Sequence, residues 1–308
     1  MTCYHPMKGW RSREVGATGK RKVTFNPSQG YADLPVTVPC GQCIGCRLEK
    51  SRQWAIRCSH EASLHKQNSF ITLTYNEANL PPSGSLNLRH FQLFMKRLRK
   101  RVHPDKIRFF HCGEYGSKLK RPHYHACLFG YDFPDKRIHT IRNEQPLYIS
   151  KILEETWGMG FCTTGEVTFK SAAYVARYIT KKVTGAQSVE YYTKTNFQTG
   201  EVTFLKPEYT SMSLKPGIGS TWFEEYSEDV FPGDFVVING KKMRPPKFYD
   251  RRLEKMSERE YRDIRSKRIK AGKKRTDDTT PARLKVREKV QELKAERLIR
   301  PLENDDDT

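Results

Sequence analysis

The sequence lacks the features of membrane-spanning and secreted proteins. It contains no run of roughly 18 apolar residues, the length that a transmembrane helix needs. Its start, MTCYHPMKGW, has no apolar segment of the kind found in signal peptides. Of its 8 cysteines, three are bunched and the others are scattered, which is not the pattern of a disulfide framework. We therefore expect a protein of a reducing cytoplasm.

Acidic residues are scarce relative to basic ones. The 308 residues include 56 Lys+Arg against 35 Asp+Glu, a formal net charge of +21. Lys and Arg that contact phosphates release counterions, so this excess predicts a polyanionic partner, with nucleic acid the first candidate. The basic segments at 96–101, KRLRKR, and at 251–300 could bind DNA phosphates or form solvated helix faces. For the whole chain, the alternative is a merely soluble basic protein.

Hydrophobic periodicity predicts an α+β protein. A first helix is expected over 47–66. Strand, helix, strand, strand, helix, strand and helix then follow at 69–75, 88–102, 106–113, 123–130, 147–157, 161–169 and 171–182. Asn87 can cap the first helix of this series. The β-α-β-β-α-β order is the split βαβ arrangement, a four-to-five-stranded antiparallel sheet with two helices on one face. We expect the opposite face to be left free for a site.

The regions outside this core have weaker signals. Residues 1–46 are rich in Gly, Pro and Cys and show no convincing helix. Residues 186–250 contain short strand-like pieces and turns, and 251–300 are dense in Lys, Arg and Glu with helical propensity and little core. The last residues, ENDDDT, read as an acidic, disordered tail.

The segment RPHYHACLFG places two histidines on one face of a strand. Residues two apart in a strand point the same way, so His123 and His125 project together. Glu114 closes the preceding strand, and a hairpin would bring its carboxylate alongside them. Such a mixed site suits Mn²⁺ or Mg²⁺, which could orient a phosphodiester for in-line attack. The alternative is a pair of ordinary strand histidines.

The helix YVARYITKK places two phenols and an ammonium on one face. Tyr178 lies four positions after Tyr174, and Lys181 returns close to the direction of Tyr174. A tyrosine hydroxyl can form a covalent intermediate when its deprotonation is assisted. The alternative is an amphipathic helix with two half-buried tyrosines.

Three cysteines follow one another at two-residue intervals. Cys40, Cys43 and Cys46 are separated by glycine-containing pairs, which lets a loop fold its sulfurs around one ion. A structural zinc site needs four ligands. Cys3 is the natural fourth, with His5 and Cys58 as alternatives. An iron–sulfur cluster and unligated thiols are the other interpretations.

These motifs together resemble a known family. ITLTY, HYH and YVARYITKK resemble the HUH endonucleases, which initiate rolling-circle DNA replication with a His-hydrophobe-His strand and a catalytic tyrosine helix. The tyrosine spacing is similar to that of the two-tyrosine class. PCGQCIGCR, RPHYHACLFG and MSLKPGIG resemble replication initiators of small single-stranded DNA phages, specifically gokushovirus-like members of the microvirus group. The resemblance covers about residues 40–250.

The resemblance implies a metal site. His123 and His125 would bind the catalytic Mg²⁺ or Mn²⁺, with Glu114 as the third ligand. His111 and Glu77 are the alternatives for that third position. The strand ITLTY would pack beneath the site and supply no chemistry.

The resemblance also implies the nucleophiles. Either Tyr174 or Tyr178 would cleave the origin strand and hold its 5′-phosphate, leaving a 3′-OH as primer. The other tyrosine would attack the regenerated origin, and the released 3′-OH would then close a circle. Lys181 would lie near the scissile phosphate, with Lys182 as second choice.

The sequence thus predicts a site-specific single-strand DNA endonuclease and strand-joining enzyme of the host bacterial cytoplasm. Its partners would be single-stranded and replicative-form phage DNA origins, with host helicase and DNA polymerase and without a membrane. The rivals are a relaxase or transposase with the same HUH core, and a non-catalytic zinc-ribbon DNA-binding protein. The expected domains are a Cys-rich element with a helix, the HUH nickase core, an accessory region and a basic tail, at 1–66, 67–185, 186–250 and 251–308.

Overall fold

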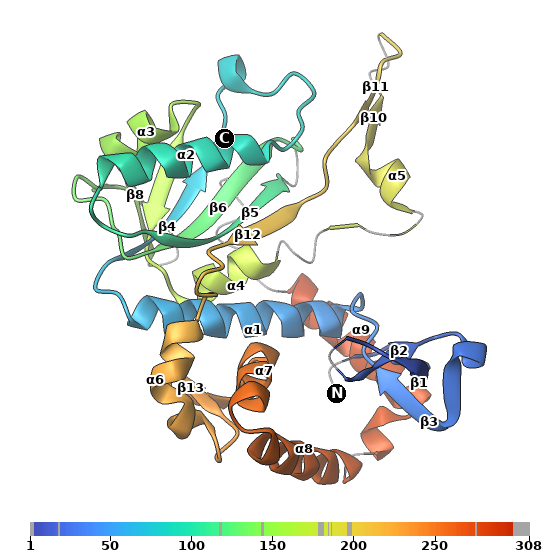
Figure 1. Cartoon of the computed structure of the whole chain (residues 1–308). Coiled ribbons are helices and arrows are strands. Elements are labelled where there is room, and N and C mark those ends of the chain that lie inside the picture. The colour runs from blue at the N-terminus through green and yellow to red at the C-terminus, as the bar shows by residue number, and fades with distance from the viewer. Residues whose placement is uncertain are drawn as a thin grey trace. The chain divides into compact units, whose positions relative to one another are not determined.

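The computed structural model of the chain (Figure 1) describes residues 3–17, 19–116, 119–142, 145–177, 182–183, 185, 187–195, 199–274 and 276–297. The chain forms two compact units. Unit 1 consists of residues 1–50 and 265–298, and unit 2 of residues 51–264 and 299–308. Unit 1 thus joins parts of the first and last segments of the sequence. Among the described residues, none of the helices combines the length and the apolar character needed to cross a membrane.

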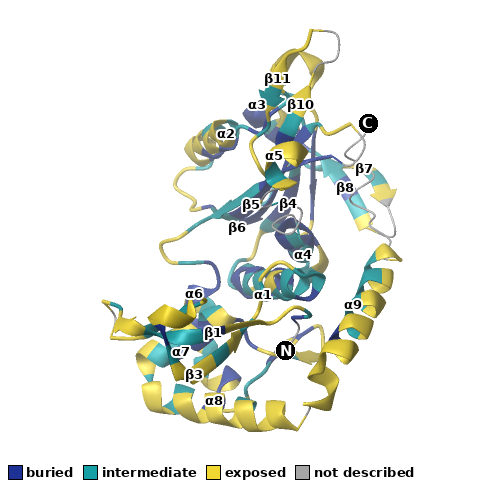
Figure 2. Ribbon diagram, turned by 90° about the vertical axis from the view of Figure 1, so that its right-hand side faces the viewer, coloured by how far each residue is buried: buried dark blue, intermediate teal, exposed yellow. Residues whose placement is uncertain are grey.

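Unit 2 is built on a seven-stranded antiparallel sheet. Its strands, from one edge to the other, are β12 (Tyr209–Met212), β5 (Arg108–Tyr115), β6 (Pro122–Phe129), β4 (Asn68–Leu73), β9 (Cys162–Gly165), β8 (Gln145–Ile149) and β7 (Arg137–Arg142). Every residue of β6, at the centre of this order, is buried (Figure 2). The sheet therefore has apolar layers on both faces.

Helices pack on both faces of this sheet (Figure 1). On one face, α2 (Leu88–Arg101) and α3 (Lys151–Trp157) cover Tyr124, Ala126 and Leu128. On the other, α4 (Phe169–Arg177) and the part of α1 (Ile44–Ser63) that belongs to unit 2 pack against the alternate residues, among them Phe110, Cys127 and Phe129. The expectation that the second face is left free is therefore wrong, because α1 and α4 cover it.

Most expected elements of the core are present. The predicted strands at 69–75, 106–113 and 123–130 correspond to β4, β5 and β6, and the predicted β-α-β-β-α-β order of elements is observed. Asn87 caps α2 as expected, because its side chain accepts a hydrogen bond from the Arg89 backbone N–H. The sheet is wider than the expected four to five strands, since β7, β8 and β12 extend its edges.

Two boundaries differ from the prediction. The helix expected over 147–157 begins only at Lys151, and residues 145–149 form β8. Ser150 sets that start, because its hydroxyl accepts a hydrogen bond from the Leu153 N–H at 3.1 Å as an N-cap. The strand expected over 161–169 ends at Gly165, and α4 begins at Phe169.

The rest of unit 2 forms a third cluster and a hairpin. Helices α6 (Ser220–Val230), α7 (Lys247–Met256) and the start of α8 (Glu258–Lys273), with strands β13 (Val236–Ile238) and β14 (Lys241–Met243), enclose a core that includes Phe223 and Tyr249. Within it, His60 of α1 stacks on Trp222 with ring centroids 3.4 Å apart. The helix α5 (Gln187–Tyr192) leads into the hairpin β10 (Thr193–Thr195) and β11 (Val202–Phe204), and a short 3-10 turn, η2 (Glu77–Asn79), precedes α2.

Unit 1 contains a small sheet and long exposed helices. The strands β2 (Arg21–Thr24), β1 (Met7–Val15) and β3 (Gly30–Val38) pair in that order, with the turn η1 (Pro27–Gln29) before β3. The unit also contains the start of α1, most of α8, the turn η4 (Asp277–Thr279) and α9 (Pro281–Glu296). Most of α8 and α9 is exposed (Figure 2). The expectation of helices with little core over 251–300 is confirmed for the described residues.

Candidate functional site

The hairpin of β5 and β6 brings the predicted metal ligands together. In its register Glu114 lies opposite His123, and Cys112 opposite His125. The Nε2 atom of His125 lies 2.7 Å from Oε1 of Glu114. All three side chains are buried, with His123 3%, His125 1% and Glu114 0% exposed. The structure thus places two imidazoles and a carboxylate on one face of adjacent strands.

Contacts at the open end of the hairpin hold this register. The Gly116 N–H donates to the Arg121 carbonyl at 2.9 Å, which closes the turn. Arg121 also donates to the Tyr75 carbonyl at 2.9 Å and forms an ion pair with Glu77. The Glu77 side chain is 83% exposed, so this carboxylate serves the turn and stands apart from the histidine pair.

His111 lies on the opposite face of the sheet from Glu114. Its ring stacks on Phe91 of α2 at 3.5 Å, and its Nδ1 lies 2.8 Å from the Ser211 hydroxyl on β12. Burial lowers the pKa of His111 to about 3, so this ring stays neutral. Of the three alternatives for the third ligand, only Glu114 lies beside the histidine pair in the described part of the chain.

Strand β4 contributes a residue that the sequence did not single out. The hydroxyl of Thr72 lies 3.0 Å from Nδ1 of His125, its partner in the strand register. Phe70 stacks on the same imidazole, with centroids 5.9 Å apart and planes at 7°. The expectation that ITLTY only packs beneath the site is therefore wrong for Thr72, which is positioned to fix the orientation and tautomer of a candidate ligand.

Helix α4 brings Tyr174 to the histidine pair. The Tyr174 ring meets the His125 ring edge-on, with centroids 5.1 Å apart and planes at 85°. Its side is packed by Phe70 at 6.2 Å, and the Arg177 guanidinium lies over its ring at 5.8 Å. Tyr174 is 2% exposed. Two of the chemical groups expected to act together are therefore in contact.

The position of α4 is fixed at its start and along its side. The Ser171 N–H donates to the Thr168 hydroxyl at 3.1 Å, and the Thr168 N–H donates to the Ser171 hydroxyl at 2.7 Å. This reciprocal pair satisfies backbone donors at the first turn. On α1, the Ser51 hydroxyl donates to the Ala173 carbonyl at 3.0 Å. Tyr178 and Lys181, the other predicted catalytic residues, lie outside the described residues.

A small cavity adjoins the cluster at Phe70. It has a volume of about 110 Å³, and its lining includes Gly165, Glu166, Thr168 and Ser171. Phe70 separates it from His125, on which that ring stacks. A cavity of this size next to the tyrosine helix could receive a small part of a substrate.

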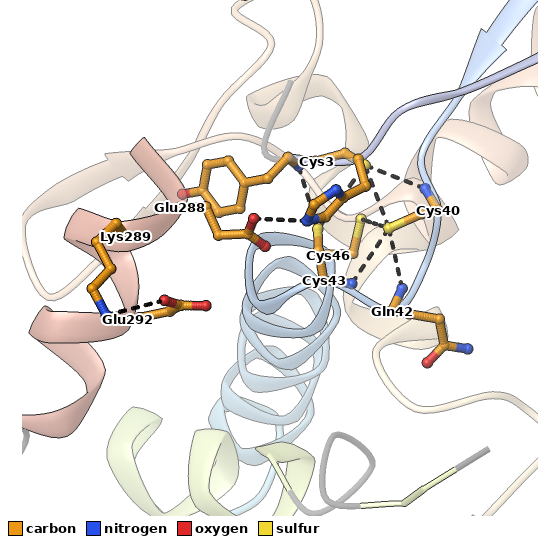
Figure 3. A network of polar contacts seen from close by, with 10 residues as sticks. Cys3, Cys40, Gln42, Cys43, Cys46, Glu288, Lys289 and Glu292 are labelled. Carbon is orange, nitrogen blue, oxygen red and sulfur yellow. Dashed lines mark hydrogen bonds and ion pairs between the residues drawn. The ribbon is translucent and has the colours of Figure 1, made fainter. Parts of the chain in front are cut away.

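The four predicted cysteines of unit 1 also come together (Figure 3). The Sγ atom of Cys40 lies 3.6 Å from that of Cys3 and 4.0 Å from that of Cys46, and Cys43 lies 4.0 Å from Cys3. Burial raises the pKa of the Cys40 thiol, but N–H donors from Cys43 and Gln42 outweigh it and bring the pKa to about 7.

The other two candidates for the fourth position are placed elsewhere. The His5 ring is 66% exposed and its Nε2 pairs with Glu288 of α9 at 2.7 Å. Cys58 is buried in the core of unit 2, beside Cys127. Cys3 is therefore the residue that joins the three bunched cysteines.

The basic stretch of α2 has a structural use. Arg97 donates to the carbonyls of Thr156 and Trp157 at 2.8 and 2.9 Å, which satisfies the end of α3. Arg99 donates to the Ile107 carbonyl at 3.2 Å, and Arg101 pairs with Glu155 at 2.9 Å. Much of KRLRKR thus holds α2 to its neighbours.

The sequence is similar to replication proteins of phages. The replication-associated protein ORF2 family matches residues 68–183. The chain is 38% identical to the replication-associated protein ORF2 of Spiroplasma virus 4, over 77% of this chain and 75% of the relative. It is 32% identical to the replication-associated protein VP4 of Bdellovibrio phage phiMH2K, over 81% of this chain and 76% of the relative. The chain belongs to this family. The expected kinship with phage replication proteins is thereby confirmed.

Other comparisons place the candidate site within the family region. The replication-associated protein ORF4 of Chlamydia phage 1 is 27% identical over 71% of this chain and 54% of the relative. No solved structure matches the chain. The matched region 68–183 begins at β4 and contains Thr72, Glu114, His125 and Tyr174, whereas the cysteine cluster lies outside it.

Proposed function

We propose that this phage replication-associated protein is a metal-dependent, site-specific single-strand DNA endonuclease and strand-joining enzyme of the HUH class. It would initiate and terminate rolling-circle replication in the host bacterial cytoplasm. One observation carries the proposal: the Tyr174 ring contacts the His125 ring, whose Nε2 lies 2.7 Å from Oε1 of Glu114. A candidate nucleophile and a candidate metal site therefore meet inside the region that defines the family.

The donor set of the candidate site fits a divalent cation. Buried imidazole and carboxylate groups need a proton or a cation to neutralise the carboxylate, and a metal can take that place between His125 and Glu114. His123, opposite Glu114 in the ladder, would complete the set. When bound, Mg²⁺ or Mn²⁺ polarises the scissile phosphate and orients it for in-line attack.

The proposed cleavage is a transesterification. The Tyr174 oxygen attacks the phosphorus, the bond from phosphorus to the 3′-oxygen breaks, and that oxygen leaves as a 3′-OH after taking up a proton. The 5′-phosphate stays on the tyrosine, and the 3′-OH primes synthesis. Because Tyr174 and His125 are almost fully buried, DNA binding must move a neighbouring segment to admit the phosphate.

The proposed joining step needs a second nucleophile. Tyr178 would attack the regenerated origin, releasing a new 3′-OH. That hydroxyl would attack the first phosphotyrosine, break its bond to the tyrosine oxygen and close the circle. Lys181 would lie near the scissile phosphate. Host helicase and DNA polymerase would supply unwinding and synthesis.

The order of the elements supports the HUH assignment. The central strands follow the order β9-β4-β6-β5, with α2 and α3 in the two crossover positions. This is the arrangement expected of a split βαβ core, with the tyrosine helix following its last strand. The candidate histidine strand, β6, lies at its centre.

Unit 1 is the proposed contact for the DNA backbone. It carries 21 Lys+Arg against 8 Asp+Glu, which is +13 of the net +21 of the chain. Since phosphate contacts by cations dominate DNA affinity, this unit can hold DNA without reading its sequence. Arg97, Arg99 and Arg101 of α2 contribute less, because they are used in contacts with protein.

The test is the formation of a covalent adduct. Single-stranded oligonucleotides that tile the phage genome are incubated with the protein and Mn²⁺, and products are separated under denaturing conditions. We expect one oligonucleotide to yield a protein–DNA band mapped to Tyr174 or Tyr178. His125→Ala should abolish this band, whereas the exposed His139→Ala, a matched control, should keep it.

The outcome separates the proposal from its rival. A gel shift without any covalent band, at every metal concentration, would identify a non-catalytic DNA-binding protein. An adduct mapped to a residue outside helix YVARYITKK would also contradict the assignment of the nucleophile.

A further inference from the structure

Unit 1 has very little hydrophobic core. Of the apolar side chains buried in the described part of the chain, only Cys3 and Leu284 belong to this unit. Its long helix α9 buries Leu284 alone. Folding must offset the conformational entropy of every ordered residue, and a unit that buries so little apolar surface needs another source of stability. Disulfides and structural metals are the usual ones.

The sulfur atoms in this unit have the spacing of a mononuclear metal site. Four sulfurs about 2.3 Å from one Zn²⁺ form a tetrahedron with edges of about 3.8 Å. The separations of 3.6, 4.0 and 4.0 Å match this edge, and all four sulfurs lie within 4.8 Å of one another. A disulfide would need about 2.0 Å. In an iron–sulfur cubane each thiolate binds a different iron, which requires sulfurs farther apart than these.

Backbone donors point at these sulfurs. The Cys40 N–H donates to Cys3 Sγ at 3.2 Å, the Cys43 N–H to Cys40 Sγ at 3.3 Å, and the Tyr4 N–H to Cys43 Sγ at 3.3 Å. Such hydrogen bonds favour the thiolate, the form that binds metal. Gly41 has φ of +78°, a conformation open to glycine, and it lets the chain turn back after Cys40.

The position of Cys43 and Cys46 adds a further favourable charge. Helix α1 begins at Ile44, so these two sulfurs lie at its positive end (Figure 3). The first N–H groups of a helix stabilise nearby anions. Four thiolates this close repel one another, and a divalent cation offsets that repulsion.

We propose that Cys3, Cys40, Cys43 and Cys46 hold one structural Zn²⁺ that takes the place of a hydrophobic core in unit 1. Cys3 precedes β1 and Cys40 follows β3, so the ion would fasten both ends of the three-stranded sheet to the start of α1. The neighbouring pair of His5 and Glu288 would extend this connection to α9. Four protein ligands leave no open position, which is the mark of a structural site.

The first test measures metal content and local protection in the full-length chain. Native mass spectrometry of protein produced with zinc should show one Zn²⁺ per chain. Cys40→Ser should lose it, and amide hydrogen exchange should then rise in residues 7–38 and 281–296 but not in β4 or β6. Cys162→Ser, in the core of unit 2, is the matched control and should keep the ion.

A second test does not depend on any variant being stable. Wild-type protein is stripped with a chelator, and hydrogen exchange is followed as single metals are returned. Zn²⁺ or Co²⁺ should restore protection of residues 7–38, whereas Mg²⁺ or Mn²⁺ should not, because hard cations bind thiolates poorly. Co²⁺ should show the visible absorption of a tetrahedral thiolate site.

Several results would overturn the proposal. These are wild-type protein without zinc when zinc is supplied, iron with inorganic sulfide in its place, or zinc that leaves while residues 7–38 stay protected. None of these measurements uses DNA cleavage, so a failure here is distinct from a failure of the proposed nuclease activity.

Discussion

Thr72→Val should weaken the binding of the catalytic metal. The Thr72 hydroxyl lies 3.0 Å from Nδ1 of His125, and the His125 Nε2 faces Glu114 at 2.7 Å. For Nε2 to offer a lone pair to a cation, the ring proton must be on Nδ1, where the Thr72 oxygen accepts it. Valine keeps the shape and suits a strand, but it removes this acceptor.

The expected size of the effect follows from burial. His125 is 1% exposed, so a water molecule has little room to replace the lost acceptor. A buried donor without a partner costs about 1–3 kcal/mol. At about 1.4 kcal/mol per factor of ten, this is roughly a 5- to 150-fold loss. Mutation of such supporting residues elsewhere lowers metal affinity by about 10- to 100-fold.

The assay is the rate of adduct formation as a function of Mn²⁺ concentration. Thr72→Val should raise the Mn²⁺ midpoint by about 10- to 100-fold and leave the rate at saturating Mn²⁺ close to wild type. Thr72→Ser retains the hydroxyl and should restore the wild-type midpoint. Thr74→Val is the control on the same segment, since the Thr74 hydroxyl bonds the Phe161 carbonyl. A lower maximal rate with an unchanged midpoint would refute the reasoning, because it indicates a general structural defect.

Three further predictions concern the site and the fold. His123→Ala and His125→Ala should each abolish nicking while DNA affinity stays near wild type in gel shifts, because phosphate contacts lie elsewhere; cleavage at the wild-type rate in limiting Mn²⁺ would contradict this. Tyr174→Phe and Tyr178→Phe should each retain some first cleavage but not release circles, and the double variant should form no adduct on denaturing gels. Burial lowers the pKa of His60 to about 3, below the unfolded value of about 6.5. Its contribution to stability is therefore present above pH 6.5 and lost as pH falls toward 3, by about 1.4 kcal/mol per pH unit in the free energy of unfolding. Chemical denaturation at several pH values should show a shallower decline for His60→Phe.

The local geometry of the site could be predicted from sequence because it depends on alternation. His123 and His125 share a face in any strand, and a hairpin brings a residue of the preceding strand beside them. Alternation also contained an answer that the sequence analysis left open. His111 and Glu114 are three residues apart, so they point to opposite faces of β5, and only one of them can reach the histidine pair. The strand register, which depends on the turn, then selects Glu114.

The contribution of Thr72 could not be predicted in the same way. It depends on β4 pairing with β6, two strands separated by a helix and by β5 in the chain. Alternation says which way Thr72 points but not which strand lies beside it. The extra strands have the same cause, since β12 joins β5 about a hundred residues later in the sequence. Long-range pairing is decided by packing, which a single sequence does not display.

The fourth cysteine shows where an elementary argument was sufficient. Cys58 follows Cys46 by 12 residues within a helix that the sequence predicted. At 1.5 Å per residue, that separation is about 18 Å, far beyond the span of one ion's ligands. The predicted helix alone therefore excludes Cys58. The choice between Cys3 and His5 was different, because it depends on how the sheet of β1–β3 returns the chain to the start of α1, and that sheet had no recognised signal. The bond from the Cys40 N–H to Cys3 Sγ makes this return visible, with both ends of the sheet meeting at the cysteine cluster.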